Sequence, residues 1–303
     1  MLFPPGRRTR PRSCKGGISL GTLAKFIAAM LIFGTNGLLA QQISLGGAEI
    51  VLLRTLLGSL FLVGLGLVRR DFRLCQLRAD LVPATLGGAV LGLNWVFLFI
   101  AYQTAGVSLS TLVYYCGPIL VLALSPLLFR EALTWNKLAA IAAVALGMFF
   151  ISGEIDPGSH VATGLLWAGG AAVFYALVII VNKQVRHLSG IHCAMYELIV
   201  SFFVVLTFLA ATGAQLPVIP AWDELPWVLT LGLVNTGLAY YLYFSAMQRL
   251  PGQTVALLCY IEPLTALLLS ALLLHEQLLP VQIAGAALIL GGACLGELRR
   301  PAA

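Results

Sequence analysis

Charge is scarce in this sequence of 303 residues: only 10% are Asp, Glu, Lys or Arg, whereas 60% are hydrophobic. An ordinary soluble domain carries about a quarter charged residues. With so little charge the chain cannot cover its own surface with polar groups, so lipid must be its solvent. The net charge of +6 does not indicate nucleic-acid binding, because the basic residues are scattered singly between apolar runs. The composition predicts an integral membrane protein.

Sequence patterns for catalysis and for metal binding are also missing. The six cysteines show no pair spacing, and the four histidines lie at span ends or in loops without metal spacing. The sequence has neither a Walker-type Gly-rich phosphate loop nor a His-Glu-x-x-His pattern. We therefore expect no cofactor, no metal and no disulfide. A polytopic membrane enzyme remains an alternative, but it would need a catalytic cluster.

Apolar runs of membrane-spanning length recur along the whole chain. A helix of about 17–25 apolar residues crosses a bilayer, and backbone groups in lipid must be paired within the segment. The runs are near 20–40, 49–68, 81–103, 107–128, 136–152, 162–182, 192–212, 226–248, 252–274 and 280–298. We predict an all-α integral membrane fold of ten transmembrane helices, with a disordered basic tail over 1–19 and a short tail over 299–303.

Lys and Arg alternate between the two ends of these predicted helices. They lie in the amino-terminal tail, in 69–80, 129–137 and 183–187, at Arg249 and in the carboxyl-terminal tail, while the intervening loops carry acidic residues. Cytoplasmic loops of membrane proteins are enriched in Lys and Arg. The pattern predicts that both termini are cytoplasmic.

One stretch occurs twice. The segment Val113–Leu133 returns as Leu258–Leu278, so that Tyr115 aligns with Tyr260 at an offset of 145 residues, and the prolines and Glu-Leu endings also align. The two halves are 20–152 and 153–298. Because each contains five spans, an odd number, the second half enters the membrane from the opposite side. Inverted repeats are typical of secondary transporters, which bind solute near the midplane where the repeats meet. The repeat predicts transport by alternating access.

The five-plus-five layout, the Pro-containing fourth and ninth helices and their endings resemble the EamA branch of the drug/metabolite transporter superfamily over 20–298. These endings are Arg130-Glu131-Ala132-Leu133 and His275-Glu276-Gln277-Leu278. Within that branch, three segments are similar to YddG-type amino-acid exporters: Phe33-Gly34-Thr35-Asn36, Val113-Tyr114-Tyr115-Cys116-Gly117-Pro118 and Val181-Asn182-Lys183. Gly117 departs from them, because relatives carry a bulky aromatic residue there.

The resemblance implies export of amino acids, aromatic or neutral, or of related small metabolites across the bacterial inner membrane, driven by gradients rather than by ATP. A carrier of another metabolite or of a cationic drug is the nearest alternative, and a channel is a further one. Protons are a possible coupling ion. The spacings Gly88-x-x-x-Gly92 and Gly292-x-x-x-Gly296 allow close helix contact within one chain or between two. Monomer and homodimer therefore both stay open.

Aromatic residues and one amide are the candidates for contact with the solute. Trp95, Phe99 and Tyr102 form a stripe on one helix face, and the offset of 145 places Tyr240 and Phe244 at matching positions. Packing within the bundle is the alternative for such a stripe, and an interhelical hydrogen bond is the alternative for a tyrosine or for Asn36, Asn94 and Asn235. The predicted substrate-binding residues are Phe33, Asn36, Trp95, Tyr102, Tyr115, Phe174, Tyr240, Phe244 and Tyr260.

Charged residues within spans each need a reason, because insertion at the bilayer centre costs roughly 2.5–3.5 kcal/mol. Glu262 lies near the midplane beside Pro263, and its repeat mate is Gly117. We expect Glu262 to exchange a proton or a substrate ammonium; a neutral carboxyl bonded to the backbone is the alternative. Arg54 and Glu197 align at an offset of 143. They are candidates for gating separate vestibules, unless each extends to the interface.

Overall fold

The computed structural model describes residues 20–69, 74–129, 135–152, 159–182, 184–185, 187–188, 190–214, 216, 218–247, 249–250, 258–277 and 279–297. Six segments in this part are long and apolar enough to span a membrane: Leu20–Ala40, Gly47–Arg69, Arg78–Ala105, His160–Asn182, Gly190–Ala211 and Leu225–Ala246. Four shorter apolar segments, Val107–Val121, Leu138–Phe150, Ile261–Leu273 and Pro280–Gly292, complete the series. The prediction of ten membrane helices in an all-α fold is confirmed.

The first half of the chain contains two interrupted spans. Its helices are α1 (Leu20–Gly34), α2 (Asn36–Ala40), α3 (Gly47–Arg69), α4 (Leu74–Ala105), α5 (Val107–Tyr114), α6 (Gly117–Phe129) and α7 (Trp135–Ser152). The fourth span breaks at Tyr115 and Cys116, directly before α6. Pro118 is the second residue of α6, a position where the missing N–H of proline costs no helical hydrogen bond. The sequence Gly117-Pro118 therefore restarts the helix after the break.

The second half repeats this arrangement with two differences in its described residues: its first span is one continuous helix, and its third span contains a π-helix. Its helices are α8 (His160–Asn182), α9 (Gly190–Ala211), α10 (Leu225–Leu229), the π-helix η1 (Thr230–Leu238), α11 (Ala239–Met247), α13 (Ile261–Leu273) and α14 (Pro280–Glu297). Where the third span is one continuous helix, the eighth passes through η1. The Thr236 hydroxyl donates to the Leu231 carbonyl five residues back, at 2.9 Å. Local π-helical turns of this kind are frequent at functional sites.

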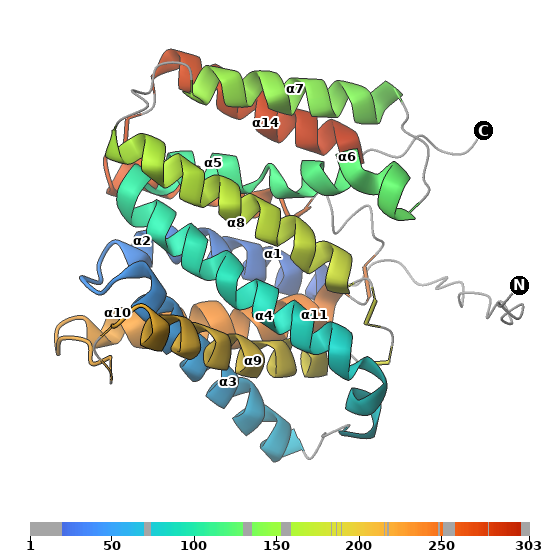
Figure 1. Cartoon of the computed structure of the whole chain (residues 1–303), viewed down its shortest axis with the longest axis vertical. Helices are drawn as coiled ribbons and strands as arrows, with labels where there is room; N and C mark the ends of the chain where they lie inside the picture. The colour runs from blue at the N-terminus through green and yellow to red at the C-terminus, as the bar shows by residue number, and fades with distance from the viewer. Residues whose placement is uncertain are drawn as a thin grey trace, which may run out of the picture.

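The contacts between the halves are symmetric (Figure 1): a helix of the first half that packs on the second has a counterpart in the second half that packs on the first. Helix α4 packs on α8 and α9, and the matching helices of the other half, α11 and η1, pack on α1 and α3. The pairs α3–α9 and α7–α14 join matching helices directly, and α5 of the fourth span packs on α13 of the matching ninth span. The glycines at 88 and 92 bring α4 against the backbone of α9, and Gly292 brings α14 against α7. The fold is that of two inverted five-helix repeats, and these described glycines serve contacts within the chain.

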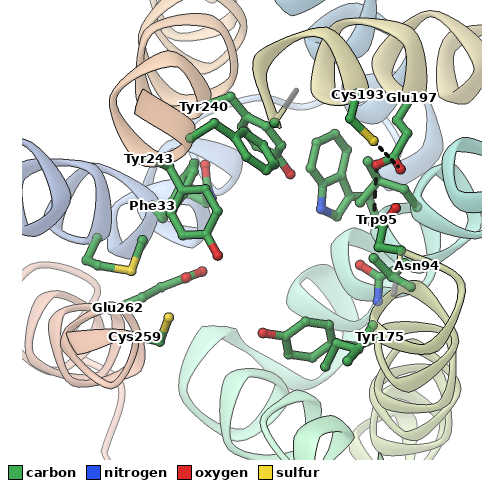
Figure 2. A pocket seen from close by; sticks show the side chains of 18 of the residues that line it. Phe33, Asn94, Trp95, Tyr175, Cys193, Glu197, Tyr240, Tyr243, Cys259 and Glu262 are labelled. Carbon is green, nitrogen blue, oxygen red and sulfur yellow. Dashed lines mark hydrogen bonds between the residues drawn. The ribbon is translucent and has the colours of Figure 1, made fainter. Parts of the chain in front are cut away.

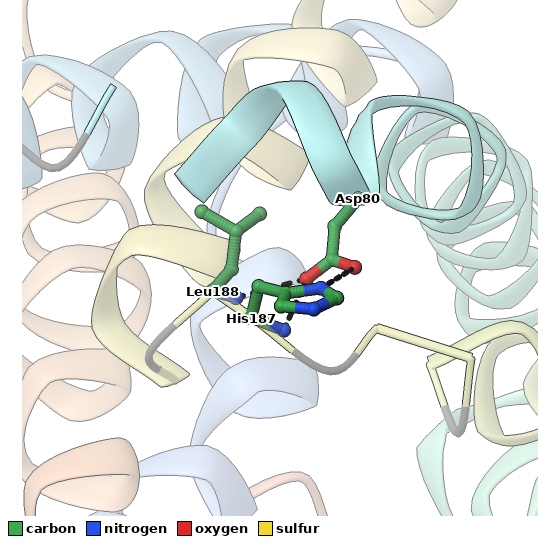
Figure 3. A network of polar contacts seen from close by, with 3 residues as sticks. All are labelled: Asp80, His187 and Leu188. Carbon is green, nitrogen blue, oxygen red and sulfur yellow. Dashed lines mark hydrogen bonds and ion pairs between the residues drawn. The ribbon is translucent and has the colours of Figure 1, made fainter. Parts of the chain in front are cut away.

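Two carboxylates fasten a loop of one half to a helix of the other. Asp80, on α4, accepts hydrogen bonds from the backbone N–H groups of His187 and Leu188, at 2.5 and 2.9 Å, and contacts the His187 ring at 3.0 Å (Figure 3). Glu224, at the start of α10, accepts from the N–H of Ser44 at 2.8 Å. Asp80 and Glu224 are 144 residues apart, as are Ser44 and Leu188. These repeat-related contacts, which we call the carboxylate latches, join the halves at the loops between their first and second spans.

A third carboxylate caps a helix of the opposite half. Glu276 accepts hydrogen bonds from the N–H groups of Val107 and Ser108, both at 2.8 Å, at the amino-terminal end of α5. A carboxylate is favoured there by the unpaired N–H groups and by the helix dipole. The capped residue Val107 lies 169 residues away from Glu276 along the chain. Its repeat mate Glu131 lies outside the described residues.

Candidate functional site

A cavity of about 620 Å³ lies between the two halves, and both contribute its lining (Figure 2). Cavities of about 300–1,000 Å³ are typical of small-molecule sites. Helices α1, α3, α4 and α5 of the first half and α8, α9, α11 and α13 of the second each place side chains in it. The cavity is thus located at the repeat interface, where the inverted repeat predicted a solute site.

Nine of the residues singled out from the sequence line this cavity. Those predicted to bind substrate are Phe33, Asn36, Trp95, Tyr115, Tyr240 and Phe244, and those predicted for coupling or gating are Glu262, Arg54 and Glu197. Tyr240 joins the aromatic residues of the two halves. Its ring contacts Phe33 edge-on at a centroid distance of 5.4 Å and Trp95 at 5.8 Å. Phe33, Trp95 and Tyr240 therefore form one aromatic wall of the cavity.

Three of the predicted substrate-binding residues, Tyr102, Phe174 and Tyr260, are not among the residues that line this cavity. Tyr102 is buried against Phe99, at a centroid distance of 5.5 Å. Phe174 packs edge-on against Phe97 on α4, at 5.1 Å. Tyr260 is partly buried in the apolar cluster that includes residues of α7 and α14. In each case the side chain lies between helices, outside the cavity lining.

The structure adds aromatic residues that sequence reasoning did not select. Tyr175, next to Phe174, faces the cavity and stacks on Tyr114 with ring centroids 4.8 Å apart. Tyr243 lies one turn after Tyr240 and lines the same wall. A Cβ atom on Gly117 would lie 2.8 Å from a Tyr175 ring carbon. The departure at Gly117 therefore leaves room for Tyr175.

Broken helices place Tyr115 and Glu262 at the cavity. Tyr115 ends α5 in the break before α6, and Glu262 lies in the first turn of α13, after the turn at Cys259 and Tyr260. Transporters commonly form their solute sites from discontinuous helices of this kind. The Glu262 carboxyl interacts with the Tyr115 hydroxyl and, through charge, with Arg54. Both repeat-related breaks therefore present polar groups to the cavity.

Arg54 does not lie at the membrane interface, which was one of the two locations expected for it. Its side chain is 2% exposed, so it does not extend to the interface. The guanidinium carbon lies 4.2 Å from the Trp95 ring centroid and 4.9 Å from that of Phe99. Its Nε donates to the Thr236 hydroxyl of η1 at 3.0 Å. Cation–π contact and one hydrogen bond thus hold the cation at the cavity wall.

Glu197 is likewise buried, at 4% exposure, and reaches the same cavity as Arg54 rather than a separate vestibule. The Cys193 thiol contacts one carboxylate oxygen at 3.3 Å, and the Asn182 amide contacts the other at 3.5 Å. Among the described residues, no ion pair joins Arg54 and Glu197. The two residues place opposite charges on one cavity.

The mid-span asparagines mainly join helices. Asn94 donates to the Ala171 carbonyl of α8 at 2.7 Å, and Asn235 donates to the Ile32 carbonyl of α1 at 2.8 Å. Asn235 also donates to the Asn36 side-chain oxygen at 3.1 Å. Asn36 itself lines the cavity. For Asn94 and Asn235 the helix-joining alternative thus describes the contacts that they make.

A membrane protein of two inverted five-helix repeats around a solute-sized cavity has the architecture of a transporter. The model of the EamA-like transporter family matches the chain twice, over residues 20–153 and 162–296. The chain belongs to this family, which confirms the resemblance inferred from the sequence.

Several relatives span most of the chain. The uncharacterized transporter YxxF of Bacillus subtilis (strain 168) is 26% identical over 91% of this chain and 89% of its own. The threonine/homoserine exporter RhtA of Escherichia coli (strain K12) is 27% identical over 78% of this chain and 77% of its own. A solved crystal structure with 22% identity aligns with a TM-score of 0.64, covering 92% of this chain and 98% of the other. That structure supports the fold alone.

Proposed function

We propose that this transporter exports amino acids or related small metabolites across the bacterial inner membrane by alternating access. The observation that carries the proposal is the cavity between the two repeats, which holds a buried guanidinium and two carboxyls among aromatic side chains. Similarity to RhtA, named as a threonine/homoserine exporter, supports amino acids as the substrate class. A gradient supplies the driving force.

The extent of the cavity supports access to the site from the cytoplasm. Its lining continues to the connection between α8 and α9, where it includes Val185, Leu188 and Gly190. The enrichment of Lys and Arg around this connection favours a cytoplasmic location, with both termini on that side. In this conformation a solute would reach the site from the cytoplasm, as an exporter requires.

Glu262 is the proposed coupling residue. It reaches the cavity from the first turn of α13, at a helix break that a rocking motion of the halves would move. Glu262→Gln should keep exchange of substrate across proteoliposomes at saturating substrate concentration but lose uptake driven by a proton gradient, because glutamine cannot release a proton. Asp223→Asn, at an exposed acidic residue, is the control. Unchanged gradient-driven flux in Glu262→Gln would remove this residue from coupling.

The substrate class is tested by counterflow. Proteoliposomes loaded with one unlabelled amino acid should accumulate the same labelled amino acid transiently, and a panel of neutral, aromatic and charged amino acids gives the specificity. Saturation of this exchange separates a carrier from a channel. If no amino acid is exchanged, the proposal fails.

One feature favours a second candidate, a carrier of organic cations. Phe33, Tyr240 and Tyr243 lie beside Glu262 (Figure 2), and aromatic faces with a carboxylate attract cations. A quaternary ammonium probe in the same counterflow assay distinguishes the two. Exchange of the probe without exchange of any amino acid would favour this candidate.

A further inference from the structure

The buried guanidinium of Arg54 is short of partners. Its Nε is bonded to Thr236, and within the described part of the chain it has no further hydrogen bond and no carboxylate within 4 Å. An arginine has five N–H donors, and Arg54 is a lining residue of the cavity. The remaining donors are therefore those that a solute can reach.

A cation held in this way needs an anion. Burying an ionised group without a counter-charge is costly, and the ring contacts with Trp95 and Phe99 offset only part of that cost. The planar fork of a guanidinium matches a carboxylate, which accepts two parallel hydrogen bonds from it. The missing partner has the chemistry of a carboxylate brought in by the solute.

The opposite charge faces the same space. Figure 2 shows the Glu262 carboxyl projecting into the cavity on the side of Phe33 and Tyr243, across from the Trp95 ring on which Arg54 stacks. Arg54 and Glu262 are close enough to interact through their charges. An ammonium group between Glu262 and the aromatic rings would be stabilised by the carboxylate and by the ring faces.

We propose that the cavity selects zwitterions, with the carboxylate of the solute on Arg54 and its ammonium at Glu262. This assignment rests on the proposed function and specifies the chemistry of its substrate. Both charges of the solute are then paired, and Asn36 and the aromatic wall remain for the rest of the molecule. An amine without a carboxylate, or an acid without an amine, leaves one buried charge unpaired and should bind weakly.

Three matched compounds test the assignment: L-phenylalanine, phenethylamine, which lacks the carboxylate, and 3-phenylpropionate, which lacks the amine. Each competes with the labelled amino acid that gives the strongest counterflow. For the wild-type protein we expect phenylalanine to compete at least about tenfold better than either analogue, since a charge-assisted hydrogen bond changes affinity by about 10- to 100-fold.

Variants then show which residue recognises which charge. Arg54→Gln should weaken competition by phenylalanine about tenfold or more and change that by phenethylamine less than about threefold. Glu262→Gln should weaken competition by phenylalanine and by phenethylamine, and change that by phenylpropionate less than about threefold. Arg54→Lys keeps the positive charge but lacks the paired N–H donors of the guanidinium. It replaces Arg54→Gln in this test if the glutamine variant does not fold. Arg78→Gln, at an exposed arginine of α4, is the matched control.

The outcomes separate the two proposals. Equal competition by phenylalanine and phenethylamine in a protein that exchanges amino acids would overturn the zwitterion assignment and leave the proposed function standing. A parallel loss of phenylalanine and phenethylamine in Arg54→Gln, in a protein that still folds, would also overturn it, since Arg54 would then not discriminate the carboxylate. Absence of counterflow for every amino acid would refute the proposed function itself.

Discussion

Replacing Asp80 by Asn should loosen the loop between α8 and α9. In the native protein the carboxylate accepts from two backbone N–H groups, those of His187 and Leu188 (Figure 3). Hydrogen bonds to a charged acceptor contribute about 1.5–3 kcal/mol each, against about 0.5–1.5 for neutral pairs. The amide keeps an oxygen but loses the charge, so each bond weakens by about 1 kcal/mol. The two together give about 2 kcal/mol.

Hydrogen exchange of the two amides measures this loss directly. A local opening free energy lowered by about 2 kcal/mol corresponds to roughly 30-fold faster exchange. The measurement is mass spectrometry of the peptide that contains His187 and Leu188, with the protein in lipid nanodiscs. Asp80→Ala, which removes the acceptor, should accelerate exchange further. Arg78→Gln, two residues away and exposed, is the control. Exchange in Asp80→Asn within about threefold of that control would refute the energetic role given to this latch.

The other predictions concern the second latch, the cavity wall and coupling. The hydrogen bond from Ser44 holds the pKa of Glu224 below its usual value. This contact therefore stabilises the fold above the ordinary pKa of about 4.3 and is lost as pH falls through the lowered pKa. Exchange protection of the Ser44 amide should stay constant from neutral pH to about 5 and fall only in stronger acid; protection lost already near neutrality would contradict this. Trp95→Ala should change the ranking of substrates in competition assays, whereas Phe174→Ala should change stability without changing that ranking. Identical rankings in the wild type and both variants would show that Trp95 contributes to packing and does not contact the substrate. Glu262→Gln should separate exchange from gradient-driven flux, as described above.

The sequence predicted the architecture well because architecture depends on quantities that a sequence displays. Run length sets the number of spans, and the offset between Tyr115 and Tyr260 indicated two halves. An odd number of spans in each half then required inversion. Glu262 and Trp95 were found for a related reason, since a charge or an indole N–H in mid-span needs a wet or polar surrounding.

The orientation of side chains could not be predicted in the same way. Helix α8 is apolar on every side, so its periodicity does not identify the face toward the cavity. Consecutive residues of a helix point about 100° apart, and Phe174 was chosen where Tyr175 lines the site. The latches carry no sequence signal either, because Asp80 and Glu224 differ in type and their partners are backbone N–H groups. Tyr243, spaced three residues from Tyr240, was an additional lining residue that helical periodicity could have identified.

The cap that Glu276 provides to α5 also bears on how the protein is made. A ribosome releases the first five helices before the second five, and the remaining 150 or so residues take roughly 8–30 s at about 5–20 residues per second. Throughout that interval the Val107 and Ser108 amides lack the carboxylate that pairs with them in the finished protein. The first half therefore stays in the bilayer with the amino-terminal end of α5 uncapped, and folding is complete only after the last two spans are inserted.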